Sequence, residues 1–310
     1  MEAPVDLDEQ IRRTRGLVAT SPSPESVGPL VALLVARGHV ALQEDRDADA
    51  SEDYRAAAAL LSSYGEDDLP VEISTARIVW ASWTARARDE GLLDEALVAA
   101  RRAVALRHDL PVDDLQPYAA FYMDLKNLAA DLEAAGRVEE RAAAARLAYE
   151  WSQAVFAAAE RYEPMIGITG TTLVHALVDS GRCGEAIEVA GETLPVLRRH
   201  GLDAIRVSLL GALGTALRRE ARWDEAVETE REALAAVRAR RSRLALVEVH
   251  LLRMLARSLV GAGRYDEARD ALREARAVVD APGTGVVPLR DEQSERIRAE
   301  LADELASLDS

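Results

Sequence analysis

The sequence predicts an all-α protein made of helical hairpins stacked one on the next. Alanine, leucine and arginine dominate its 310 residues and aromatic residues make up only 4%, a composition that favours helix over sheet. Apolar residues recur with the period of an α-helix along most of the chain. Short turns also recur, about 40 to 45 residues apart, and such a spacing is typical of a repeated hairpin. The turn residues are Gly91, Gly136, Gly181, Ala221 and Gly263.

The segment 210–233 shows one hairpin most clearly. Three leucines fall on one face of its first helix, namely Leu210, Leu213 and Leu217. Gly214 lies among them, and because a glycine inside a helix costs about 1 kcal/mol relative to alanine, we expect a neighbouring helix to pass close to it. Asp224 and Glu225 mark the start of a second helix, since carboxylates are favourable near helix N-termini. Trp223 at the turn offers a large apolar plug.

Six residues of this hairpin share the spacing of a known repeat: Leu210, Gly214, Leu217, Trp223, Ala226 and Ala233. The pattern resembles the tetratricopeptide repeat (TPR), with Ala221 in place of the glycine that precedes the turn. The usual repeat has about 34 residues, so this chain is similar to the long-helix form found in kinesin light chains and bacterial regulators. The resemblance covers roughly residues 72–280. It implies a right-handed α-solenoid in which the first helix of each pair lines a concave face.

The remaining segments extend this prediction to the whole chain. Residues 7–64 predict an N-terminal helix and a degenerate hairpin, and 72–280 hold the TPR-like repeats. After a break at 282–285, residues 288–308 predict a polar helix with one apolar stripe. The end of a solenoid needs such a capping helix, which is apolar on its inner face and charged on its outer face. We therefore expect residues 1–310 to form a single elongated domain.

Charge and composition exclude several classes of partner and site. The net charge of −16 argues against nucleic acid and anionic membranes as partners. Cys183 is the only cysteine, which excludes an internal disulfide, and the five histidines show no metal-ligand spacing, so no metal and no cofactor are expected. The N-terminus lacks an apolar signal sequence, and no apolar run of about 18 residues predicts a membrane span. These features, with Lys126 as the only lysine, indicate a cytoplasmic protein from a bacterium with high-GC coding.

No catalytic residue is assigned, because the two candidate motifs have simpler interpretations. Cys183 lies in a turn position that usually holds an aromatic residue, and His175 is two helical turns upstream. A reactive thiolate would need a nearby base, so we interpret Cys183 as a small buried apolar residue. The segment 167–172, GITGTT, lacks the preceding strand and the following Gly-Lys-Ser/Thr of a phosphate loop. We expect a helix there instead, entered after Pro164.

The predicted binding site lies on the concave face, where the TPR family places the first helix of each pair. The cationic residues predicted for this face are Lys126, His175, Arg218, Arg219, His250, Arg253 and Arg257. Arginines on such a face can fork onto carboxylates or phosphates. In the alternative interpretation these cations pair within the stack, with Asp124, Glu133, Asp179 or Glu248.

Three functions are compatible with the sequence. The first is a non-enzymatic scaffold that binds a protein or peptide, including one with acidic groups, on the concave face. Trp80 and Trp83 would add apolar contact to that scaffold if they are exposed. The second is a regulatory protein that senses a ligand or peptide and acts through a partner chain. The third is an enzyme that uses the groove as a reaction cavity, for which no polar constellation is visible. A homo-oligomer is compatible with each.

Overall fold

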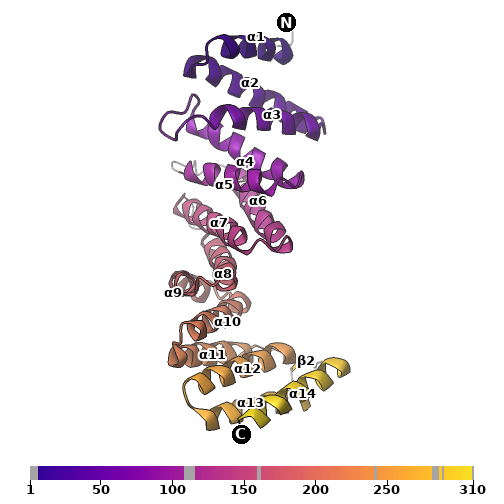
Figure 1. The fold of residues 1–310 in the computed structure, drawn as a ribbon, viewed down its shortest axis with the longest axis vertical. Coiled ribbons are helices and arrows are strands. Elements are labelled where there is room, and N and C mark those ends of the chain that lie inside the picture. Colours follow the sequence, from indigo (N-terminus) through magenta and orange to yellow (C-terminus); the bar gives the residue numbers. More distant parts are fainter. Residues whose placement is uncertain are drawn as a thin grey trace. The chain divides into compact units, whose positions relative to one another are not determined.

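Fourteen helices and one pair of two-residue strands make up the regular structure of the described residues, so the predicted all-α class is confirmed (Figure 1). The structure is a computed structural model that describes residues 6–107, 116–158, 162–240, 243–280, 286–287 and 290–308. The strands β1 (Arg243–Leu244) and β2 (Val286–Val287) pair in parallel. They join the two segments that flank the last hairpin.

The chain divides into two compact units, of which unit 1 comprises Met1–Tyr162. Its helices are α1 (Leu7–Thr20), α2 (Pro24–Gln43), α3 (Asp47–Leu61), α4 (Ile73–Asp89), α5 (Leu93–Ala105), α6 (Gln116–Ala134) and α7 (Val138–Ala158). After α1, the helices form the hairpins α2–α3, α4–α5 and α6–α7, and each hairpin packs against the next. These three pairs correspond to the expected degenerate hairpin and the first two expected repeats.

Unit 2 comprises Glu163–Ser310 and repeats the same arrangement. Its helices are α8 (Glu163–Asp179), α9 (Cys183–Arg199), α10 (Asp203–Arg219), α11 (Trp223–Arg238), α12 (Ala245–Gly261), α13 (Tyr265–Asp280) and α14 (Asp291–Ser307). The hairpins α8–α9, α10–α11 and α12–α13 stack in chain order, with α14 against α13. Helix α8 includes the segment 167–172 as expected, but it begins at Glu163, one residue before Pro164 and not after it.

The turns between paired helices follow one backbone design. Four turn glycines share a positive φ between 69° and 77°: Gly91, Gly136, Gly181 and Gly263. Glycine enters this left-handed region without strain. Ala221 takes the same conformation with φ at 56°, which costs a non-glycine residue about 1 kcal/mol. The amide of Arg222 then donates to the carbonyl of Leu217 at 2.9 Å and closes the end of α10.

Small residues let the helices of unit 2 approach closely. A Cβ on Gly214 would lie 2.8 Å from Oε1 of Glu230 on α11, so this glycine makes room for a neighbouring helix, as expected. A Cβ on Gly261 would clash with the ring of Trp223, which packs against α12 as the predicted plug. Ala226 and Ala233 are fully buried in the same core. Larger side chains at these positions would push the paired helices apart.

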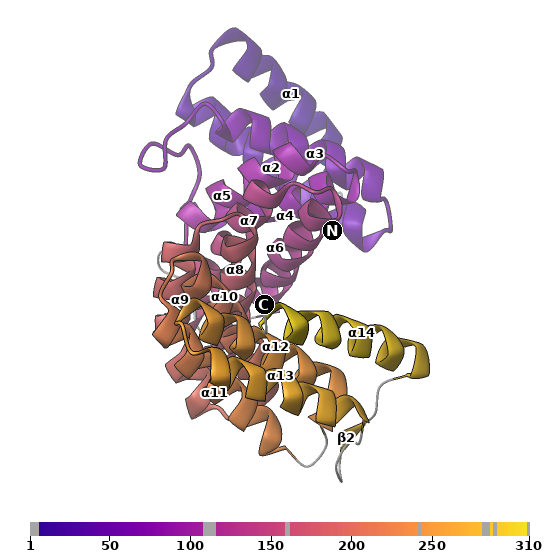
Figure 2. The ribbon, with the colours of Figure 1, turned by 60° about the horizontal axis from the view of Figure 1, so that its bottom comes forward.

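The predicted capping helix is present as α14, which lies next to α12 and α13 (Figure 2). Ile297 and Leu301 are buried in the core of unit 2, whereas the outer face carries exposed charges such as Glu295 and Arg296. The break expected at 282–285 lies outside the described residues. Because the two units are described separately, the single elongated domain stays a prediction.

Helix α2 departs from the expectation that no segment is apolar enough to span a membrane. It is the one described helix that is long and apolar enough to do so by length and composition alone. In the structure, α2 packs against α1 and α3, and Val31 and Leu34 are fully buried. A core helix of this kind meets the same criterion.

Candidate functional site

Unit 2 contains a groove on one face of α8, α10 and α12, the first helices of its three hairpins. Its volume is about 470 Å³. The floor is apolar, with Val207, Leu251 and Met254 buried beneath it. We call it the α8–α12 groove; its polar lining consists of His175, Asp179, Ser208, Thr215, Arg219, Arg240 and His250. The groove therefore contains residues of the first helices that the sequence analysis predicted to lie on one face.

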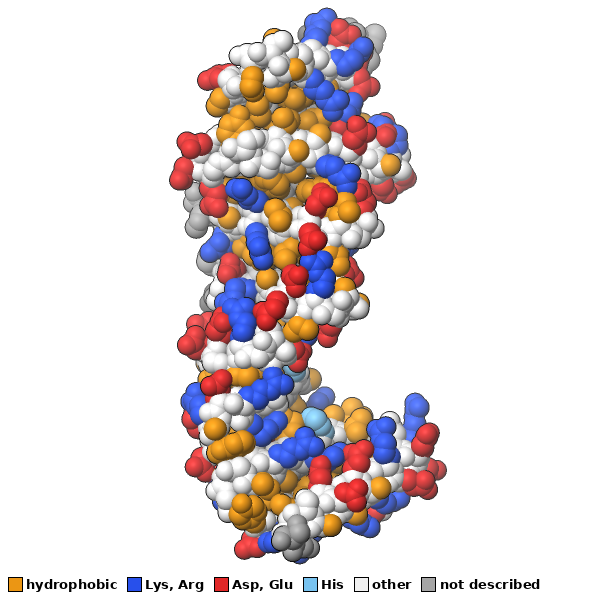
Figure 3. Space-filling view, in the orientation of Figure 1, with side chains coloured by type: hydrophobic (Ala, Val, Ile, Leu, Met, Phe, Trp, Pro, Cys, Tyr) orange, Lys and Arg blue, Asp and Glu red, His pale blue; other side chains and the backbone are white. Residues whose placement is uncertain are grey.

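Cationic side chains dominate the charge of the α8–α12 groove. Arg240 and His250 make no hydrogen bond or ion pair with any residue that the structure describes. Arg219 donates to the backbone carbonyl of Val178. Asp179 is the one carboxylate among the lining residues. In Figure 3, blue cationic side chains and a histidine gather on this part of unit 2, so the groove carries positive charge in a chain whose net charge is −16.

The two histidines of the groove differ in their surroundings. Nε2 of His175 lies 2.9 Å from the hydroxyl oxygen of Ser208, so this ring is held in place by a hydrogen bond. The pKa of His250 is lowered, first by burial and then by the positive charges of Arg253 and Arg257. His250 is therefore neutral at pH 7. An anion bound beside it would favour its protonation.

Arg253 and Arg257 are predicted partner-binding residues, but helix α14 already holds them. Arg253 donates to Glu300 at 2.6 Å and to Glu304 at 2.7 Å. Arg257 donates to Glu304 at 3.2 Å, and its side chain stays 60% exposed. The alternative of pairing within the stack therefore describes these two arginines, although the carboxylates lie on the capping helix and not at the expected positions.

Arg218 also pairs within the stack and does not line the groove. Its guanidinium donates to Oε1 of Glu230, whose side chain is 0% exposed, and to the hydroxyl of Thr215 at 2.9 Å. The second carboxylate oxygen of Glu230 is buried without a hydrogen-bond partner among the described residues. The space opened by Gly214 admits this buried ion pair, which fixes α10 to α11.

The other predicted candidates lie away from the α8–α12 groove. Lys126 is an exposed residue of α6 and belongs to unit 1, which is described separately from unit 2. Cys183 is buried at the start of α9, as the apolar interpretation expects. Among the described residues, no group of three or more His, Cys, Asp or Glu side chains could hold a metal ion.

Sequence reasoning missed Arg240 as a groove residue. Arg240 belongs to the arginine-rich segment 238–241 and follows the end of α11. Arg240 nevertheless lines the same groove as His250 of α12. Helical periodicity orders residues within one helix, whereas this placement depends on the path of a connection.

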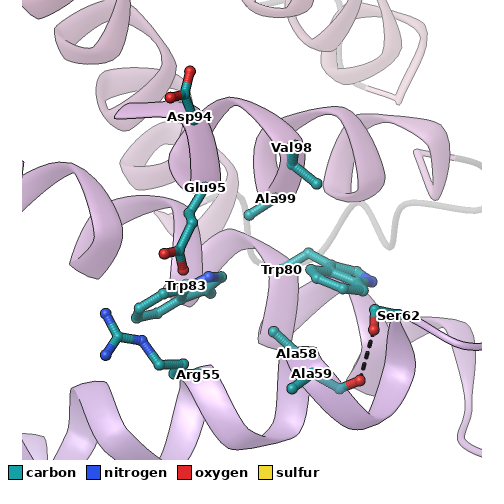
Figure 4. Close-up of a pocket in the computed structure, with 10 residues that line it drawn as sticks. All are labelled: Arg55, Ala58, Ala59, Ser62, Trp80, Trp83, Asp94, Glu95, Val98 and Ala99. Carbon is teal, nitrogen blue, oxygen red and sulfur yellow. Dashed lines mark hydrogen bonds between the residues drawn. The ribbon is translucent and has the colours of Figure 1, made fainter. Parts of the chain in front are cut away.

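Trp80 and Trp83 were predicted to contact a partner only if they are exposed, and the structure shows that they are buried. Their side chains are 5% and 4% exposed. They form the floor of a second hollow, of about 310 Å³, between α3 and α5 in unit 1 (Figure 4). We call this hollow the Trp groove. It is lined by Arg55, Ala58, Ala59, Ser62, Trp80, Trp83, Asp94, Glu95, Val98 and Ala99.

Comparisons with known proteins support the fold. No family model matches the chain, and no curated protein sequence matches it. Among solved structures, the apo form of RapI is 12% identical, with a TM-score of 0.50 over 97% of this chain and 85% of that chain. BtubC (BKLC) from P. vanneervenii is 15% identical, with a TM-score of 0.46 over 96% and 93%. A tetratricopeptide repeat protein from Parabacteroides merdae is 11% identical, with a TM-score of 0.37 over 90% and 88%.

The likeness to RapI agrees with the architecture built up from the residues. Antiparallel pairs stack in order, and each turn residue takes a positive φ. Small residues lie where neighbouring helices meet, and a polar helix covers the last pair. The chain therefore has a TPR-like helical repeat fold.

Proposed function

We propose that this protein is a non-enzymatic scaffold that binds a protein or peptide partner in the α8–α12 groove. A single observation carries the proposal. Arg240 and His250 face the groove without partners among the described residues, while only one carboxylate lines it. An acidic group of the partner would pair with the guanidinium of Arg240 and accept a hydrogen bond from His250. Because the rest of the chain is strongly acidic, such a cationic groove also directs acidic segments to this surface.

The apolar floor of the groove supplies the second part of recognition. Val207, Leu251 and Met254 lie between the polar side chains of α10 and α12. Apolar contacts give most of the affinity of a peptide, and a few polar groups fix its position. We therefore infer a partner segment that carries an apolar side chain beside an aspartate, a glutamate or a C-terminal carboxylate.

A regulatory protein that senses a ligand or peptide is the second candidate. The observation that favours it is the size of the groove, since about 470 Å³ lies within the usual range of about 300 to 1,000 Å³ for small-molecule sites. Occupation of the groove would then alter the contacts of this protein with a partner chain.

Capture of partners on immobilised protein tests the first proposal. The variant is Arg240→Glu, which reverses one unused cation without touching the core. The matched control is Arg273→Glu, because Arg273 is an exposed arginine of α13 outside the groove. We expect a captured protein that is retained by wild type and control and is reduced about tenfold on Arg240→Glu.

The outcomes separate the two candidates. Equal capture by all three forms would place the partner elsewhere and contradict the proposal. If no protein is captured, native mass spectrometry of the purified chain tests whether it retains a small molecule. A retained molecule that Arg240→Glu releases would support the regulatory protein instead of the scaffold.

A further inference from the structure

The Trp groove of unit 1 has an apolar floor and a rim that carries charge (Figure 4). Trp80 and Trp83 lie side by side beneath the opening, with α3 on one side and α5 on the other. Val98 is an exposed apolar residue on the α5 side, with 55% of its surface accessible. Ala59 is exposed on the α3 side. The two rims therefore present apolar surface to the solvent above the indole rings.

A repeated ion pair of the turns is missing at this groove. In four hairpins, the arginine that follows the turn residue pairs with a glutamate in the first turn of the next helix. These pairs are Arg137–Glu140 at 3.0 Å, Arg182–Glu185 at 2.7 Å, Arg222–Glu225 at 2.6 Å and Arg264–Glu267 at 2.7 Å. In the hairpin α4–α5 the equivalent residues are Leu92 and Glu95. Leucine cannot pair with the carboxylate, so Glu95 lacks the partner that its counterparts have.

The cations closest to the rim already have partners. Arg55 lies over the ring of Trp83, 4.7 Å from its centroid, and donates to Glu90 at 2.8 Å. Arg137 donates to Asp94. Glu95 makes no ion pair with the described residues. The rim therefore retains one carboxylate without a cation, directly beside the apolar floor.

The exposed position of Val98 also departs from the repeat. Counted from the turn residue of each hairpin, the equivalent positions in unit 2 are Glu188, Glu228 and Asp270. All three are exposed acidic residues, which is the usual choice for the outer face of a helix. At the Trp groove, the exposed Val98 therefore stands where these hairpins have an acidic residue. One turn earlier, Glu95 lacks the arginine partner that its counterparts have.

We propose that the Trp groove binds a partner protein segment in which an apolar side chain lies next to an arginine or lysine. The apolar side chain enters between α3 and α5 and covers the indole rings and Val98. The adjacent cation pairs with Glu95 and takes the place of the arginine that the turn lacks. This interaction lies in unit 1 and is independent of the partner proposed for the α8–α12 groove.

The acidity of the chain supports a basic occupant over an acidic one. The net charge is −16, and both Asp94 and Glu95 belong to the first turn of α5. A carboxylate-bearing segment would meet like charge at the rim, whereas a cation would gain an ion pair that is partly shielded by the apolar contact. Such complementarity selects partners and increases their association rate.

The variant Leu92→Arg tests the proposal at a half-buried turn position outside the lining of the groove. It supplies the cation that four other hairpins contain, so Glu95 gains an internal partner and the fold is retained. The second variant, Val98→Glu, gives the rim the acidic residue found in unit 2. The control is Ile78→Glu, because Ile78 is an exposed apolar residue of α4 outside the groove. Circular dichroism confirms folding of each form.

The probes are two arrayed sets of synthetic, fluorescein-labelled peptides. In the first set a fixed leucine or phenylalanine is followed by arginine at separations of one to four residues, and in the second set glutamate replaces arginine. Fluorescence anisotropy gives Kd for each. We expect the best arginine peptide to bind wild type about tenfold more tightly than its glutamate match. Leu92→Arg should weaken that binding about fivefold because the new arginine occupies Glu95. Val98→Glu should also weaken it about fivefold, because the lost apolar contact outweighs the attraction of one more exposed carboxylate, while Ile78→Glu leaves it unchanged.

Three results would overturn the proposal. The first is that wild-type protein shows no preference between the arginine and glutamate sets. Both groove variants could bind the best arginine peptide as tightly as wild type does. Finally, analytical ultracentrifugation could reveal self-association that Leu92→Arg abolishes, which would assign the groove to a second copy of this chain.

Discussion

The two grooves of this protein use the same helical hairpin for opposite chemistry. In unit 2, the α8–α12 groove lies on the first helices and presents Arg240 and His250 without partners among the described residues. In unit 1, the Trp groove lies between α3 and α5 and presents the carboxylate of Glu95. The buried residues hold the helices together, so the fold does not restrict which side chains occupy these exposed positions. A repeated fold therefore fixes where a recognition surface can lie, while single exposed substitutions decide its charge.

The buried ion pair of unit 2 gives the largest expected effect and tests whether the two units fold separately. Glu230→Ala removes the one carboxylate of the described residues that pairs with the largely buried guanidinium of Arg218. An unpaired buried charge costs about 3 kcal/mol, so the free energy of unfolding of unit 2 should fall by about that amount. Urea unfolding of the full chain, with hydrogen exchange resolved by segment, measures the change in each unit.

The matched control is Glu228→Ala on the same helix. Glu228 is exposed and pairs with Arg231 at 2.8 Å, and such a surface pair contributes less than about 1 kcal/mol. In the Glu230→Ala variant, the amides of unit 1 should keep their wild-type protection. An equal loss of protection in both units would show that they unfold together, and the comparison of separate units would fail.

The repeated elements of this fold were predictable because their signals lie within one hairpin. Turn glycines, apolar residues at helical spacing and the buried alanines of the second helix are local patterns. The hairpins from α4 to α13 follow them, with Ala221 in place of the turn glycine in α10–α11. Gly214 indicated a close helix contact from its position alone. The capping helix was recognisable from Ile297 and Leu301 on one stripe of a charged segment.

The partners of the exposed cations were not predictable, because they come from helices far apart in the chain. Arg253 meets Glu304, which lies 51 residues later. Periodicity places each residue on one face of its helix. Which residues of two helices lie opposite each other depends on how the hairpins stack. The same reason explains why the sequence alone left open whether Trp80 and Trp83 are exposed, whereas in the structure both side chains are buried.

A pH titration of binding sharpens the contrast between the two grooves. In the unbound protein, burial and neighbouring arginines hold the pKa of His250 below its usual 6.5. A carboxylate bound beside His250 would raise that pKa, so binding takes up a proton. The affinity for an acidic peptide should therefore rise about tenfold as pH falls from about 7.5 to about 5.5. Anisotropy titrations of a peptide captured by the α8–α12 groove measure this slope.

The variant His250→Asn removes the titrating group and should flatten the profile. The free energy of unfolding of the unbound protein should change in the opposite direction. The lowered pKa of His250 contributes stability above a pH of about 6.5, and this stability is lost as the pH falls. An affinity that falls on acidification in the wild type would contradict the placement of an anionic group beside His250. Binding at the Trp groove should show no such dependence on His250.

The turn of hairpin α10–α11 allows a smaller, stabilising change. Ala221 has a positive φ of 56°, where the equivalent turns of the other described repeats have glycine. Ala221→Gly should remove this strain and raise the free energy of unfolding of unit 2 by about 0.5 to 1 kcal/mol. The matched opposite change is Gly181→Ala, which should lower it by a similar amount. Thermal unfolding of both variants against wild type gives the two signs, and two shifts in the same direction would contradict the strain argument.

The smallest expected effect concerns Val98 and decides what the Trp groove is for. Val98 is 55% exposed, and exposed substitutions away from special backbone positions change stability by less than about 0.5 kcal/mol. Val98→Glu should therefore leave the urea midpoint almost unchanged while it weakens binding of the basic peptide. If the variant instead loses more than about 1 kcal/mol, Val98 contributes to the packing of α3 against α5. The exposed valine would then belong to the core of unit 1, and the difference in charge between the two units would no longer indicate two kinds of partner.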